Sequence, residues 1–157
     1  MSKPCSKCKG EMSLEILDPF YGEEAGLKLG VQQMPALICA QGHKRFIHIE
    51  FAAQLMDLMA NPGTFNSIPA AAKKGLFKKR YHCPGCDVEL PEMPTGHQAL
   101  EVVAEPSKAE PFKVLVEVPV FTCGGCGKVS IRSAEEVAKL AFKATDHAYR
   151  SIDIHPT

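Results

Sequence analysis

The seven cysteines of this 157-residue chain fall into closely spaced groups of the kind that bind metal ions. A tight turn presents both thiolates of a Cys-x2-Cys pair on the same side, so two such pairs can complete a tetrahedron around one ion. The second half of the chain contains this arrangement in full. Its predicted ligands are Cys83, Cys86, Cys123 and Cys126.

The first half repeats this pattern with one change. It has a Cys-x2-Cys pair at Cys5 and Cys8, a third cysteine at Cys39, and then His43. A cluster of three cysteines needs a fourth donor, and an imidazole is longer than a thiolate, so one additional residue in the turn is tolerable. The Cys-x3-His spacing therefore predicts that His43 is the fourth ligand. We expect two Zn²⁺ ions at structural sites.

Other uses of paired cysteines are less well supported. A thioredoxin-like redox pair needs a free Cys-x2-Cys beside a βαβ pattern, which is not visible. An iron site also uses two cysteine pairs and remains an alternative, although the histidine in the first set favours zinc. Catalytic zinc keeps one position open for water. We find no carboxylate pair, nucleophile–base set or glycine-rich phosphate loop, so we do not expect an enzyme.

The elements that must position these ligands form a diverged internal repeat. In each copy a Pro-x3-Cys segment, beginning at Pro35 or at Pro119, approaches the second ligand group. Alternating apolar residues predict two strands between the ligand groups of each copy. The predicted strands lie near 12–17 and 27–38 in the first copy and near 98–104 and 112–122 in the second, with turns at 21–26 and 105–110.

A helix is expected after each ligand set. The first spans residues 50–60, and Asn61-Pro62-Gly63 should end it. The second should begin at Ser133, which forms a Ser-x-x-Glu capping box with Glu136. Both helices are expected to cover a small sheet with their apolar faces, formed by Phe51, Leu55, Leu58 and Met59 in the first and by Val137, Leu140, Ala141 and Ala144 in the second.

Residues 61–80 are predicted to be a basic linker with a short Ala-rich helix from Pro69 to Leu76. Phe77 and Tyr81 are aromatic residues that could stack on bases, and Lys44 and Arg45 add positive charge near the first ligand set. A solvated linker helix is the simpler interpretation. The candidate nucleic-acid-binding residues are Lys73, Lys74, Lys78, Lys79 and Arg80.

The formal net charge of the chain is zero, with 18 basic and 18 acidic residues, which disfavours a polyanion-binding role for the protein as a whole. The beginning of the sequence lacks the apolar core of a signal peptide, and no apolar run approaches a membrane span. We therefore expect a cytoplasmic protein. In a reducing compartment, paired cysteines favour metal over disulfides.

The segments Met34-Pro35-Ala36-Leu37-Ile38-Cys39 and Val118 to Gly127 resemble the YgiT-type zinc-finger domain, which is found at the N-terminus of MqsA-like antitoxins. That domain combines Cys-x2-Cys, a long β-hairpin, a Val-Pro-x3-Cys approach and Cys-x2-Cys-Gly. The resemblance implies a zinc-ribbon fold and suggests a zinc domain that binds a protein. The antitoxins' helix-turn-helix DNA-binding domain has no counterpart in this sequence.

These observations predict a small, metal-stapled α+β fold with two zinc-ribbon modules, at 1–60 and 81–157, joined by the linker 61–80. Each half is too small for a large core, so each is expected to unfold when its metal is removed. The predicted function is that of a non-enzymatic protein-interaction adaptor or regulator. The alternative is a nucleic-acid-binding protein that contacts RNA, the ribosome or a transcription complex through the basic linker.

Overall fold

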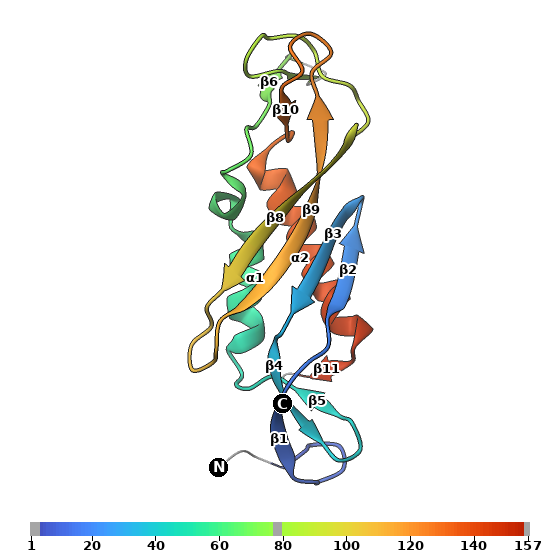
Figure 1. Ribbon diagram of the computed structural model, residues 1–157, viewed down its shortest axis with the longest axis vertical. Helices are drawn as coiled ribbons and strands as arrows, with labels where there is room; N and C mark the ends of the chain where they lie inside the picture. Colours follow the sequence, from blue (N-terminus) through green and yellow to red (C-terminus); the bar gives the residue numbers. More distant parts are fainter. Residues whose placement is uncertain (1–3, 77–79, 156–157) are drawn as a thin grey trace.

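The computed structural model describes residues 4–76 and 80–155, which form an elongated α+β molecule. A mostly antiparallel sheet lies at one end, a larger antiparallel sheet lies at the centre, and a short hairpin lies at the other end (Figure 1). The elements are β1 (Met12–Ile16), β2 (Phe20–Glu24), β3 (Leu27–Gln32), β4 (Pro35–Cys39), β5 (Lys44–Arg45), α1 (Phe51–Ala60), the 3-10 helix η1 (Pro62–Phe65), β6 (Ala72–Lys74), β7 (Arg80–His82), β8 (Gly96–Ala104), β9 (Phe112–Thr122), β10 (Val129–Ser130), α2 (Ala134–Ser151) and β11 (Ile154–His155).

The central sheet combines strands from both halves of the sequence. Its long strand β9 pairs with β8 on one side and with β3 on the other, and β3 pairs with β2. The register between the halves places Gly30 opposite Leu115 and Lys28 opposite Glu117. The hairpin β2–β3 is therefore inserted between two strands of the end sheet, β1 and β4, and completes the central sheet.

The sequence predicted a single strand near 27–38, and this prediction is wrong. The chain breaks at Gln33, where φ is 58°, a left-handed conformation that ends a strand. Strand β3 before the break joins the central sheet, whereas β4 after it pairs with β1 in the end sheet. The predicted turn at 21–26 is also too long. Strand β2 occupies most of it, and only Ala25 and Gly26, both with positive φ, form the turn.

The predicted strands near 98–104 and 112–122 are confirmed as β8 and β9, and both helices are confirmed. Helix α1 ends at Ala60, and the side-chain oxygen of the following residue, Asn61, accepts a hydrogen bond from the N–H of Gly63 at 2.9 Å. Helix α2 begins after Ser133, whose hydroxyl accepts from the N–H of Glu136 at 3.0 Å. Ser133 thus satisfies one of the four free N–H groups at the start of the helix.

One large core joins the two halves. Helix α2 packs against β2 and β3 of the first half, and α1 packs against α2. A chain of aromatic rings crosses the same boundary: Phe51 stacks on Phe112 with ring centroids 5.8 Å apart, and Phe46 meets Tyr149 edge to face at 4.8 Å. The two halves therefore share one main core, because α1 and the β2–β3 hairpin bury their apolar residues against the second half.

The linker also differs from its predicted form. Residues Pro69 to Leu76 form no helix: Ala70 makes a parallel bridge with Ile131, and β6 pairs with β7 as a hairpin. The last strand, β11, returns to the first half and pairs in parallel with β5. Within the ranges 4–76 and 80–155, no helix is both long enough and apolar enough to cross a membrane.

Candidate metal centres

The four cysteines predicted for the second site come together at one end of the molecule. Cys83 and Cys86 lie in the turn after β7, and Cys123 and Cys126 lie in the turn between β9 and β10 (Figure 1). All four sulfur atoms lie within 4.8 Å of one another. The Sγ atoms of Cys86 and Cys123 are 3.4 Å apart and those of Cys83 and Cys126 are 3.6 Å apart. This group could hold a metal ion.

The first predicted set comes together at the opposite end of the long axis (Figure 1). Its four donor atoms also lie within 4.8 Å of one another. The Nδ1 atom of His43 is 3.4 Å from the Sγ atoms of both Cys5 and Cys39, and the Sγ atoms of Cys8 and Cys39 are 3.7 Å apart. The structure thus brings the eight residues that the sequence predicted as metal ligands together in two groups of four.

Spacings of 3.4–3.7 Å are too long for disulfides, whose sulfur atoms are about 2.05 Å apart. All seven cysteines are free. Tetrahedral bonds of about 2.3 Å to sulfur and about 2.0–2.1 Å to nitrogen place neighbouring donors about 3.6–3.8 Å apart. The observed spacings are close to this value, so the donors already have the geometry of a four-coordinate metal site.

Three of the four ligand turns close in the same way. The N–H of the first cysteine donates to the carbonyl five residues later, and the residue after the second cysteine has positive φ. The hydrogen bonds run from Cys5 to Gly10 (2.9 Å), from Cys83 to Val88 (2.8 Å) and from Cys123 to Lys128 (2.9 Å), with positive φ at Lys9, Asp87 and Gly127.

The turn that carries His43 is one residue tighter. The N–H of Cys39 donates to the carbonyl of His43, four residues later, at 3.2 Å, and Gly42 has φ of 87°. His43 therefore lies after the left-handed residue, immediately before β5, and not in the position of a fourth cysteine. The sequence correctly predicted that His43 joins the cluster, but the reason differs: the turn is shortened, and the longer imidazole reaches back to the cysteines.

Backbone N–H groups in these turns stabilise the thiolate forms that bind metal. The N–H of Cys8 lowers the pKa of Cys5 to about 6, although burial of Cys5 opposes this shift. The N–H of Cys126 lowers the pKa of Cys123 to about 6 in the same way. Hydrogen bonds favour the charged form of a thiol and burial disfavours it. Both clusters therefore contain a cysteine that is largely ionised at neutral pH.

Each metal cluster has a small apolar core of its own, separate from the large central core. Cys5 and Cys39 pack with Met12 and Leu37 at one end of the molecule. At the other end, Cys83 and Cys123 pack with Leu90 and Phe121. The guanidinium of Arg132 lies 4.7 Å from the ring centroid of Phe121 and makes a cation–π contact with this second core.

The basic residues proposed for nucleic-acid binding are partly neutralised. Lys74 forms an ion pair with Asp87 and lowers the pKa of that carboxyl group. Arg80 pairs with Glu89 at 2.8 Å. Lys73 lies exposed on β6, whereas Phe77, Lys78 and Lys79 lie outside the described residues. Two of the proposed contacts thus have acidic partners beside the second metal cluster.

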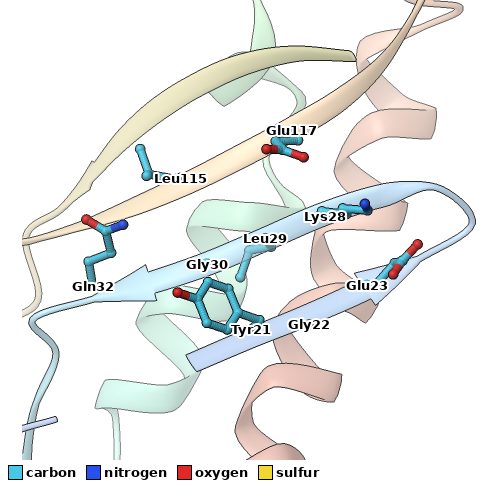
Figure 2. Close-up of a pocket in the computed structure, with 9 residues that line it drawn as sticks. All are labelled: Tyr21, Gly22, Glu23, Lys28, Leu29, Gly30, Gln32, Leu115 and Glu117. Carbon is cyan, nitrogen blue, oxygen red and sulfur yellow. The ribbon is translucent and has the colours of Figure 1, made fainter. Parts of the chain in front are cut away.

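Sequence reasoning missed a groove on the face of the central sheet that lies opposite α2. It has a volume of about 530 Å³ and is formed by β2, β3 and β9 (Figure 2). Lys28 lies between the carboxylates of Glu23 and Glu117 on neighbouring strands, and the ring of Tyr21 lies beside Gly30. Residue alternation along each strand was the available signal, but the groove appears only when strands from both halves pair.

Comparison with protein-family models, with curated proteins and with solved structures finds no match for this chain.

Proposed function

We propose that this protein is a non-enzymatic zinc protein that acts as a protein-interaction adaptor or regulator. In it, two structural Zn²⁺ ions hold two ribbon-like ends on a shared central core. Cys83, Cys86, Cys123 and Cys126 would hold one ion, and the three cysteines and one histidine of the first set would hold the other. Four strong ligands per ion are typical of structural zinc, and zinc would supply conformational stability to the turns.

The spacing of the donors supports the metal part of this proposal. Thiolate and imidazole together favour zinc over the harder cations that prefer oxygen, and the histidine in the first set favours zinc over an iron–sulfur cluster. Elemental analysis of protein purified without chelators should give two zinc ions per chain. Cys126→Ser should retain one, and the predominance of iron would overturn the assignment.

The groove on the central sheet carries the adaptor part of the proposal. Its face is not covered by either helix, and Tyr21, which is 65% exposed, lies on it with the apolar Leu115 nearby. Aromatic residues are enriched at protein interfaces, and mixed charges set specificity for a complementary protein surface. The alternating charges of Glu23, Lys28 and Glu117 suit such a partner better than a polyanion.

The test is capture of partners from a native lysate by immobilised wild-type protein and by Tyr21→Ser. Phe142→Ser is the matched control, because Phe142 is also exposed but lies on α2. We expect partners that resist nuclease and are lost only with Tyr21→Ser. Capture that is sensitive to nuclease and falls steeply with salt would instead support nucleic-acid binding through the basic linker.

A further inference from the structure

The central sheet has a long free edge at β8. This strand pairs with β9 over all of its residues, from Gly96 opposite Val120 to Ala104 opposite Phe112. Within the ranges 4–76 and 80–155, no strand pairs with its other side. Alternate residues of an antiparallel strand direct their N–H and C=O groups away from the existing partner. The free edge of β8 therefore presents a row of backbone donors and acceptors.

Natural proteins usually protect such an edge with short strands or with unpaired charges. The other free edges of the described sheets follow this rule, because β1 and β2 have five residues each, β11 has two, and β2 carries two adjacent glutamates. Strand β8 has nine residues. Its ionisable side chains are held by the same chain: Glu101 pairs with Lys113 at 3.3 Å, and His97 Nε2 donates to the carbonyl of Gly26 at 2.9 Å.

We propose that β8 is a self-association edge, at which two copies of this chain pair their β8 strands antiparallel about a two-fold axis at Leu100. The two central sheets then become one continuous sheet. A two-fold axis perpendicular to a sheet keeps each side chain on its own face, so one residue must lie opposite itself. Leu100 is the central residue of β8, and only this register pairs all nine residues.

Charge distribution favours the same register. With Leu100 on the axis, Glu101 lies opposite the partner's Ala99, and no like charges face each other. A shift of the axis to Glu101 would place two carboxylates directly opposite, which is destabilising in a strand pair. The strand is therefore complementary to its own copy, and this argues for a second copy over an unrelated extended peptide.

The same pairing would cover apolar surface beside the edge. Val103 is 48% exposed, and a groove of about 310 Å³ lies between the end of β8 and α1, lined by Leu55, Leu58 and Phe112 among others. In the proposed register, the segment that precedes β8 in the partner continues past Ala104 toward this groove. That segment carries Met93, which is 75% exposed. Burial of these residues adds a hydrophobic contribution to the backbone hydrogen bonds.

Cross-linking of the zinc-loaded protein tests the register. Opposed residues in an antiparallel pair have Cα atoms about 4.5–5.5 Å apart, a distance that a disulfide spans. Leu100→Cys should therefore give a covalent dimer under mild oxidation. Gln98→Cys should not, because its two copies would be about 14 Å apart. A mixture of Gln98→Cys and Val102→Cys should cross-link again, and equal cross-linking of every variant would overturn the register.

Two variants of opposite charge at Ala99, which is exposed and lies opposite Glu117 of β9 in its own chain, test the interface, and their stability as monomers is compared first by chemical denaturation. Ala99→Glu would face the partner's Glu101 and should shift the protein to the monomer in sedimentation equilibrium, whereas Ala99→Lys should retain the dimer. Circular dichroism checks that both variants are folded. A wild-type chain that stays monomeric at every concentration, or Glu and Lys variants that dimerise equally, would overturn the proposal.

Discussion

Removal of both metal ions should unfold the two ends of the molecule and leave its centre folded. The large core contains residues of both halves and none of the metal ligands, whereas each cluster packs only against its own small core. This arrangement replaces the expectation, drawn from the sequence, that each half unfolds completely when its metal is removed.

The magnitude can be worked out for the second end, where the ligand turns 83–88 and 123–128 contain twelve residues. Fixing their backbone costs roughly 12–24 kcal/mol at 1–2 kcal/mol per residue. Burial of Leu90 and Phe121 returns about 3–6 kcal/mol. Zinc contributes on the order of 10–16 kcal/mol. With the metal these contributions are nearly balanced, and without it the ordering cost exceeds the gain by roughly 6–21 kcal/mol.

Hydrogen exchange measured by mass spectrometry tests this prediction. The protein is compared with and without a zinc chelator under reducing conditions. Protection should disappear from 83–90 and 123–130 and from 5–12 and 37–45, and should persist in α2 and in the paired part of β8 and β9. Cys123→Ser provides a control in which only the second end should lose protection. Simultaneous loss of protection in α2 would refute the reasoning, because it would show that the ends and centre unfold as one unit.

Three further predictions follow from individual contacts. His43→Cys should release one of the two zinc ions, measured by elemental analysis, because a cysteine side chain is too short to reach the cluster from its position beside β5. Zinc affinity, measured by competition with a chromophoric chelator, should decrease as the pH is lowered, because protons compete with zinc for the thiolates of Cys5 and Cys123. Their folded-state pKa of about 6 lies below the ordinary 9.0, so the thiolates stabilise the folded turns fully above about pH 9 and lose this contribution as the pH falls to about 6. Gly22→Ala should cost about 1–3 kcal/mol in chemical denaturation, because a Cβ there would overlap the carbonyl oxygen of Ala144 in α2.

Retention of two zinc ions by His43→Cys would show that a side chain as short as cysteine can reach the cluster from position 43. A zinc affinity that is independent of pH down to about 6 would show that the hydrogen-bonded thiolates do not control binding. For the glycine, Gly96→Ala is the control, since a Cβ at Gly96 has no neighbour within 4 Å, and equal stability of the two variants would contradict the close approach of β2 to α2.

The grouping of the eight candidate ligands into two clusters, both helices and the hairpin β8–β9 were predictable from the sequence, because each depends on local chemistry. Two cysteines separated by two residues meet in one turn whatever the rest of the chain does, and Ser133 caps a helix through a residue three positions later. The resemblance to YgiT-type zinc fingers concerns these local patterns, and membership of that family stays a prediction.

The tertiary structure alone decided where β3, β4 and β11 pair. Alternation along 27–38 indicates that side chains are buried, but it does not identify the partner, and the break at Gln33 sends β3 and β4 to different sheets. The pairing of β3 with β9, and of β11 with β5, joins residues that are far apart in the sequence. Such pairings depend on the apolar area buried when whole elements meet. For this reason, the two ligand clusters at the ends of the molecule were predictable from the sequence, whereas the single core that joins the two halves was not.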